Sequence, residues 1–372
     1  MIRSAKLKDL ESLVALENSS FSSDRFSRRS FRYLLTKANA ETLVYENGDH
    51  LAGYVMLLFN MGTSLARMYS LAVYPGDQGK GIGTALIQAA EDHVREHDCM
   101  SMRLEVRKDN LGSIQLYEKL GYKRFGTLHD YYEDHMEAIR YEKFLTPTQK
   151  PDLFRVPYYE QTLEFTCGPS ALMMAMKSVD PDLKLDRKLE LRIWRESTTI
   201  FMTSGHGGCG PYGLALSAYR KGYDVEVYVN GEGVLFVDSV RSKEKKEVMR
   251  LVQEDFIDEL KKSSVSLHAG VLSVAEIQRK FESGGVPIVL ISSYRIYREK
   301  FPHWVVVTGC DDKYIYVHDP YVDYDDDKGS IDTMNMPILK REFERMARYG
   351  KAGQKAVLVI RKGKKRTKAG GC

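Results

Sequence analysis

The stretch TPTQKPDLFRVP, residues 146–157, divides this chain of 372 residues into two parts. It holds three prolines in twelve residues and has little hydrophobic periodicity, so it favours neither a helix nor a strand. The length suits two domains of roughly 100–200 residues each. We therefore predict a linker at 146–156, an N-terminal domain over 1–145, a second domain over 157–361 and a basic tail over 362–372.

The N-terminal part alternates between strand and helix patterns. Strands are predicted at IRSA, ETLVYEN, DHLAGYVMLLF, RMYSLAVY and MRLEVR, with a hairpin turn at Asn47-Gly48. Helices are predicted at LKDLESLVALEN, FSRRSFRYLLTK, GIGTALIQAAEDHVREH and NLGSIQLYEKLGYKRFG, the last closed by Gly121. Mixed elements with short connections indicate an α/β sandwich.

The C-terminal part has its helices early and its strands late, which is an α+β pattern. Helices are predicted at about 168–178, 186–196, 211–222, 246–262 and 274–283. Strands are predicted at VEVYV, VPIVLIS, HWVVVTGC, YIYVHD and KAVLVIR.

Composition limits the classes of protein to consider. The chain is 43% hydrophobic and 28% charged, as in globular proteins, and its net charge of +4 is too small to indicate a nucleic-acid partner. Five scattered cysteines form no disulfide framework and fit a reducing compartment. The charged N-terminus lacks the apolar core of a signal peptide, and no apolar run is long enough to span a membrane. We predict a cytoplasmic protein with no membrane partner, and the oligomeric state stays open.

Three glycines follow the predicted strand SLAVY and precede a helix. Gly79, Gly81 and Gly83 let the backbone approach a ligand, and the helix start offers free N–H groups to an anion. The motif lacks the Lys-Ser/Thr ending of a P-loop. It also lies in the third quarter of its domain, which disfavours a Rossmann fold.

The segment Gln78–Thr84 resembles the Q/R-x-x-G-x-G/A signature of the GNAT acyltransferases, and LEVRKDNLGSIQLYEKLGYKRFG is similar to the second half of that fold in the ribosomal-protein-alanine N-acetyltransferases. The resemblance covers about residues 1–145 and implies an α/β GNAT fold. It also implies acetyl-CoA as cofactor, lying along Leu71, Ala72 and Val73. The predicted cofactor contacts are completed by Gly79, Lys80, Gly81, Ile82, Gly83 and Thr84 at the pyrophosphate and Asn110 at the pantetheine arm.

The same resemblance implies the catalytic groups of the transfer. Glu105 would be the general base that deprotonates the attacking amine, through a water molecule, and Tyr117 the general acid that protonates the departing CoA thiolate. The acceptor would be a peptide or protein amine.

The segment EQTLEFTCGPSALMMAM contains a cysteine at the start of a predicted helix. A catalytic cysteine requires a histidine base and a partner that orients the histidine. His303 begins the strand HWVVVTGC, and a hairpin with YIYVHDP can bring it near Asp319. Cys167, His303 and Asp319 thus form a candidate triad in papain-like order.

This half resembles the papain-like family of bacteriocin-processing, double-glycine peptidases. The resemblance covers about residues 155–361 and rests on Gln161, Cys167-Gly168, His303-Trp304-Val305-Val306 and Asp319-Pro320. It implies that Cys167 is the nucleophile, His303 the general base and acid, and Asp319 the orienting group. Gln161 would donate a hydrogen bond to the oxyanion together with the Cys167 backbone amide. The implied substrate is a peptide or leader sequence.

Other interpretations of the second half stay open at this point. Cys209, close to His206 in SGHGGCGPYG, is a competing nucleophile, and this glycine-rich loop could instead line a substrate groove. The thiol site could act as an amidase, deamidase or transpeptidase, because water or an amine can resolve an acyl-enzyme. The half could also be a non-catalytic peptide-binding module that regulates the acetyltransferase. No metal site is predicted.

Overall fold

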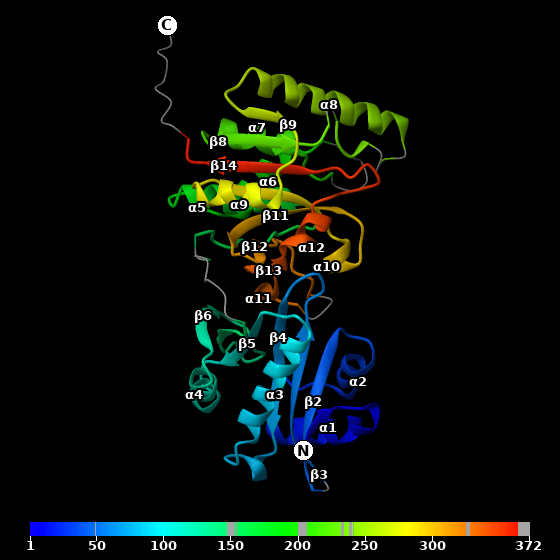
Figure 1. Cartoon of the computed structure of the whole chain (residues 1–372), viewed down its shortest axis with the longest axis vertical. Helices are drawn as coiled ribbons and strands as arrows, with labels where there is room; N and C mark the ends of the chain where they lie inside the picture. Colours follow the sequence, from blue (N-terminus) through cyan, green and yellow to red (C-terminus); the bar gives the residue numbers. More distant parts are fainter. Residues whose placement is uncertain are drawn as a thin grey trace. The chain divides into compact units, whose positions relative to one another are not determined.

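The computed structural model describes residues 1–48, 50–146, 153, 155–199, 207–231, 234–237, 240, 242–324 and 328–363. The chain forms two compact units, Met1–Thr148 and Gln149–Cys372 (Figure 1). Most of the predicted linker and nearly all of the predicted tail lie outside the described residues. The predicted domain boundaries therefore stay a prediction.

Unit 1 is built on a seven-stranded sheet with the order β1-β2-β3-β4-β5-β7-β6. Neighbouring strands run antiparallel except for β4 and β5, which are parallel. The strands are β1 (Ile2–Ser4), β2 (Ala40–Asn47), β3 (His50–Phe59), β4 (Leu65–Val73), β5 (Ser101–Arg107), β6 (Lys123–Leu128) and β7 (Ala138–Phe144).

Helices pack on both faces of this sheet. Alternate side chains of β3 enter different cores, since successive residues of a strand point to opposite faces. Tyr54 and Met56 pack with α1 and α2, whereas Val55 and Leu57 pack with α3. The helices are η1 (Leu7–Asp9), α1 (Leu10–Ser20), α2 (Arg28–Thr36), η2 (Pro75–Asp77), α3 (Ile82–Glu96) and α4 (Leu111–Lys119).

The predicted strands and helices of unit 1 are present in the structure, but α4 ends at Lys119, and residues 123–126 of the segment predicted as its helix belong to β6. Gly48 forms the hairpin turn with φ +63°, and Gly121 follows α4 with φ +89°. The strands β6 and β7 were not predicted. No residue of β6 is fully buried. A strand with no buried face does not need alternating apolar and polar residues, and the sequence KRFGTL shows no such alternation.

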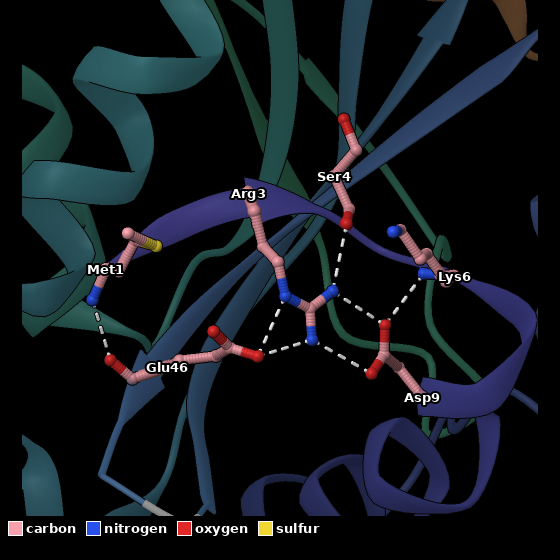
Figure 2. Close-up of polar contacts among 6 residues, drawn as sticks. All are labelled: Met1, Arg3, Ser4, Lys6, Asp9 and Glu46. Carbon is pink, nitrogen blue, oxygen red and sulfur yellow. Dashed lines mark hydrogen bonds and ion pairs between the residues drawn. The ribbon is translucent and has the colours of Figure 1, made fainter.

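A charged cluster fixes the start of the chain (Figure 2). The guanidinium of Arg3 on β1 forms two hydrogen bonds with the Asp9 carboxylate, at 2.8 and 3.0 Å, and a hydrogen bond from Nε to Glu46 at 2.8 Å. The Met1 amine donates to the carbonyl of Glu46. These contacts connect β1 to β2 and to the beginning of the first helix.

Unit 2 is built on a second seven-stranded sheet, in the order β13-β12-β11-β10-β14-β8-β9. All neighbours are antiparallel except β8 and β9, which are parallel. The strands are β8 (Asp224–Val229), β9 (Ser266–Ala269), β10 (Val286–Ser292), β11 (Pro302–Cys310), β12 (Tyr314–His318), β13 (Met336–Leu339) and β14 (Ala356–Arg361).

The helix α5 packs against β10, β11 and β14, and α6 and α7 extend this layer. Residue 168 must be small here, because a Cβ on Gly168 would lie 3.2 Å from the Trp304 ring and 3.1 Å from Leu214. The helices are α5 (Cys167–Val179), α6 (Arg187–Ser197), α7 (Pro211–Arg220), α8 (Lys243–Lys261), α9 (Val274–Glu282), α10 (Tyr294–Tyr297), α11 (Ser330–Thr333) and α12 (Lys340–Met346).

All five predicted helices and all five predicted strands of unit 2 are present. The elements that were not predicted are β9, β13, α10, α11 and α12, each of four to seven residues. Segments this short do not complete a clear periodic pattern. Across the described part of the chain, no helix combines the length and the apolar character that a bilayer span requires.

Candidate active sites

The sheet of unit 1 opens where β4 and β5 diverge. The two strands pair only between Leu65–Met68 and Ser101–Leu104. Beyond this point β4 continues to Val73 and β5 to Arg107. Two adjoining pockets lie along the diverging ends, one beside the glycine motif and one beside Glu105.

The pocket beside the glycine motif has a volume of about 560 Å³. Nine of the ten residues predicted to contact acetyl-CoA line it, namely Leu71, Ala72, Val73, Gly79, Gly81, Ile82, Gly83, Thr84 and Asn110. The tenth, Lys80, does not line it; its Nζ pairs with Asp77 at 2.7 Å. Asn110 caps α4, because its side chain accepts a hydrogen bond from the Ser113 amide.

The glycine loop has the backbone that an anion cradle requires. Gly79 and Gly81 adopt φ angles of +77° and +81°, which residues other than glycine rarely adopt. At the start of α3, the first helical hydrogen bond runs from Ala85 N to Gly81 O. The backbone N–H groups before Ala85 have no acceptor within the helix, so they can bind an anion. The loop and pocket therefore fit the pyrophosphate and pantetheine of a coenzyme A thioester.

The second pocket, of about 450 Å³, shares the lining residues Ser20, Phe21, Leu71, Asn110 and Ser113 with the first. Both predicted catalytic residues of the transfer, Glu105 and Tyr117, line it. Its other acidic residues are Glu17, Asp24, Asp109 and Asp134. Arg107 also lines the pocket and pairs with Asp109 and Asp134. The structure thus brings the two predicted catalytic groups together at a pocket that has more acidic than basic side chains and that adjoins the cofactor cradle.

Glu105 forms a buried ion pair with Arg67 of β4. The Arg67 Nε lies 3.0 Å from Glu105 Oε2, and both side chains are about 5% exposed. A positive charge at this distance favours the ionised carboxylate, which is the form that a general base requires. Arg67 was not predicted as part of the site. A charged residue within the apolar strand pattern LARMYSLAV was the available signal.

Tyr117 is 6% exposed and packs edge-on against Tyr122. Burial raises the pKa of its phenol well above the ordinary value of 10. The phenol therefore keeps its proton at neutral pH, as a general acid must.

The three predicted triad residues of unit 2 meet where β11 begins and β12 ends, beside the start of α5. Cys167 is the first residue of α5, His303 lies at the start of β11, and Asp319 directly follows β12. His303 Nε2 lies 2.5 Å from Asp319 Oδ1, and the Cys167 side chain is close enough to the imidazole to contribute to the raised pKa of His303. The imidazole thus bridges the carboxylate and the thiol, as the triad requires.

The surroundings of His303 favour its protonated form. Burial alone lowers the pKa of His303, but Asp319 and Cys167, through charge and hydrogen bonds, raise it to about 10. A protonated imidazole beside the candidate nucleophile holds a proton that it can give to a leaving group.

The Asp319 carboxylate is fully buried and held from three sides. Besides His303, it accepts hydrogen bonds from the Tyr297 hydroxyl at 2.8 Å and from the Tyr321 amide at 2.9 Å. The rings of Tyr297, Phe301 and Tyr321 surround His303. Tyr297 was not predicted, and no sequence motif marks it.

Gln161 lies beside this triad in sequence and in space. Its backbone N–H donates to the carbonyl of Pro320 at 2.8 Å, next to Asp319. Its side-chain Nε2 donates to Leu163 O at 2.9 Å. Because an amide nitrogen has two protons, the second one is available for an oxyanion. In α5 the first helical hydrogen bond runs from Ser170 N to Thr166 O. The backbone N–H of Cys167 lies before it and has no acceptor within the helix.

Cys209, the competing nucleophile, is 7% exposed. Burial and the neighbouring Cys167 raise the pKa of its thiol well above the ordinary value, which disfavours a nucleophilic role. Its carbonyl accepts a hydrogen bond from Trp304 Nε1 at 3.0 Å, so its segment borders the triad. His206 lies outside the described residues.

Comparisons with known proteins match each unit separately. Residues 156–361, just over half of the chain, match the Peptidase_C39 like family. Residues 8–122 match the Acetyltransferase (GNAT) family. A Bacillus subtilis protein provisionally named ribosomal protein bS18-alanine N-acetyltransferase is 32% identical over 37% of this chain and 89% of its own length. An N-alpha-acetyltransferase of Sulfurisphaera tokodaii is 30% identical over 37% of this chain and 88% of its own length.

Proposed function

The chain belongs to the Peptidase_C39 like family and, through its N-terminal unit, to the GNAT N-acetyltransferases, and from this premise we propose that it is a bifunctional enzyme. Unit 1 transfers an acetyl group from acetyl-CoA to a peptide or protein amine. Unit 2 cleaves a peptide or leader sequence with the triad Cys167, His303 and Asp319.

The acceptor class is supported by the relatives and by the acidic pocket. The two relatives are named for acetylating a ribosomal protein alanine and alpha-amines. The pocket is lined by five acidic side chains and one cation, Arg107, so the excess of negative charge favours the approach of a cationic amine. These observations favour a protein or peptide terminus as the acceptor.

When bound, acetyl-CoA supplies the acetyl group as an activated thioester. Glu105, ionised beside Arg67, accepts the proton of the ammonium group through water, so that a neutral amine forms in the pocket. Tyr117, which lines the same pocket, holds a proton at its phenol oxygen and can donate it to a leaving thiolate.

For the thiol reaction, Cys167 Sγ attacks a peptide carbonyl and forms a tetrahedral adduct. Gln161 Nε2 and the Cys167 amide donate hydrogen bonds to the oxyanion. His303 then gives its proton to the leaving amine, and water hydrolyses the acyl-enzyme. The observation that carries this assignment is the bridging position of His303 between Asp319 and Cys167.

A reducing compartment suits both reactions. The four cysteines within the described residues, Cys99, Cys167, Cys209 and Cys310, are all free thiols. Such cysteine usage supports the cytoplasm as the site of action.

Peptide-library mass spectrometry with acetyl-CoA tests the proposal. We expect the wild type to cleave and to acetylate peptides, Cys167→Ala to acetylate only, and Tyr117→Phe to cleave with normal rates. A mass shift of about one unit without chain cleavage would instead identify a deamidase, since the acyl-enzyme of a side-chain amide gives that product. If neither variant differed from the wild type, both site assignments would be wrong.

A further inference from the structure

Glu190 of α6 is a carboxylate with no exposed surface that the triad does not include. A charged group in the interior is costly unless its oxygens are hydrogen-bonded. Within the described residues, its hydrogen-bond partners are hydroxyls and one amide, and none of them is a cation. They are Tyr159 Oη at 3.0 Å, Thr162 N at 2.8 Å, Thr162 Oγ1 at 2.8 Å, Thr166 Oγ1 at 2.5 Å and Ser170 Oγ at 3.4 Å.

All these partners belong to one segment, residues 159–170, which carries both the oxyanion donor and the nucleophile. Thr162 directly follows Gln161, and Thr166 directly precedes Cys167. The carboxylate therefore holds both ends of the turn between the two groups.

The turn has a second point of attachment at Leu163. Its carbonyl accepts hydrogen bonds from Gln161 Nε2 at 2.9 Å and from the Thr166 amide at 3.1 Å, and it lies 2.7 Å from Thr166 Oγ1. A shift of Thr162 or Thr166 would therefore move the Gln161 side chain relative to the start of α5. Such a shift matters because an oxyanion donor acts only within hydrogen-bond distance of the oxyanion.

We propose that Glu190 is a positioning residue of the thiol reaction, which fixes the Gln161 side chain relative to Cys167. The proposal rests on the proposed function of unit 2. Glu190 contacts no reacting atom, so its effect is on the geometry of the transition state. Loss of such an interaction lowers kcat and leaves KM unchanged.

The test compares Glu190→Gln with Glu196→Gln on a peptide that the wild type cleaves. Glutamine keeps the size of the side chain but replaces one acceptor oxygen with a donor. Glu196 is a matched control, because it lies on the same helix and binds Ser217 and Lys221, outside the segment 159–170. We expect Glu190→Gln to lower kcat about tenfold with KM within about twofold, and Glu196→Gln to change neither by more than about twofold.

A folded Glu190→Gln protein with wild-type kcat would overturn the proposal, as would an equal loss in Glu196→Gln. If Glu190→Gln does not fold, Tyr159→Phe removes one donor and leaves the carboxylate in place. It should lower kcat severalfold with unchanged KM. An unchanged kcat in a folded Tyr159→Phe protein would then count against the proposal.

Amide hydrogen exchange separates this proposal from the proposed function. In Glu190→Gln, the amides of Gln161 and Thr162 should exchange faster than in the wild type, and those of the Glu196→Gln control should not. If the wild type cleaves no peptide but the exchange rises in this way, the peptidase assignment fails and the positioning role stands. If the exchange is unchanged, the positioning role is wrong whatever the activity.

Discussion

The two units build their sites in different ways. In unit 1 the ligand pockets arise where the backbones of β4 and β5 diverge, and glycines in left-handed conformations shape the cofactor loop. In unit 2 the proposed reacting groups come from α5, β11 and the end of β12, and buried hydrogen bonds hold His303 and Asp319. The shape of the first site therefore depends mainly on the backbone, and the geometry of the second site depends mainly on contacts between side chains. Single side-chain changes should accordingly have their largest effects in unit 2.

The largest expected effect is that of Asp319→Asn. The amide can no longer stabilise the His303 imidazolium, so kcat for peptide cleavage should fall about 10³–10⁴-fold. Steady-state kinetics on a cleaved peptide would measure it. The control is Asp311→Asn at the other end of the same hairpin, where the carboxylate binds Tyr314 N and Tyr316 Oη. Equal losses in both variants would show a structural effect and not a catalytic one.

Tyr117→Phe should have the largest effect in unit 1. Loss of the general acid should lower kcat for acetyl transfer about 10²-fold and leave KM for acetyl-CoA unchanged. Release of free CoA thiol gives the rate. Tyr122→Phe is the matched control, since the two rings pack together and Tyr122 is not among the residues that line either described pocket at this site. A normal kcat in Tyr117→Phe would remove this residue from the reaction.

Gly81→Ala tests whether the backbone shapes the cofactor site. A Cβ at a φ of +81° is strained, so the loop should shift and KM for acetyl-CoA should rise about tenfold. Gly48→Ala imposes the same kind of strain at φ +63° in a hairpin turn outside the cofactor pocket. Both variants should lose about 1 kcal/mol of stability in chemical denaturation. Only Gly81→Ala should change KM for acetyl-CoA. An equal change in Gly48→Ala would contradict the claim that the backbone at Gly81 shapes the cofactor site.

The smallest expected effect is a change with pH in the stability that the His303–Asp319 pair contributes. The pKa of His303 in the folded chain, about 10, lies above its ordinary value of 6.5. The ion pair with Asp319 therefore stabilises the fold fully below pH 6.5, and this contribution is lost as the pH rises through about 10. The difference in unfolding free energy between wild type and Asp319→Asn should shrink by at least about 1 kcal/mol from pH 6 to pH 10. A constant or growing difference would mean that His303 is neutral throughout.

The sequence predicts the long periodic elements of both units and the groups that belong to short motifs. The glycine loop, the Cys167 helix start and the His303–Asp319 hairpin are visible because each is a local pattern. The residues that hold these groups in place cannot be predicted from a local sequence pattern. Arg67 contacts Glu105 across 38 positions, Tyr297 contacts Asp319 across 22, and Glu190 contacts Thr162, the neighbour of Gln161, across 28. Only tertiary structure brings them to the site. A charge within an apolar strand pattern marks Arg67 as unusual, but it does not reveal the partner of Arg67.

The central claim is that one chain carries two separate chemistries. Its most direct test is to alkylate Cys167 with iodoacetamide, verify the modified residue by peptide mapping, and measure both activities on the same sample. Because each unit has its own core, we expect peptide cleavage to fall to background while the acetyl-transfer rate stays within about twofold of the untreated protein. Cleavage that survives complete alkylation of Cys167, or acetyl transfer that is lost with it, would contradict the claim.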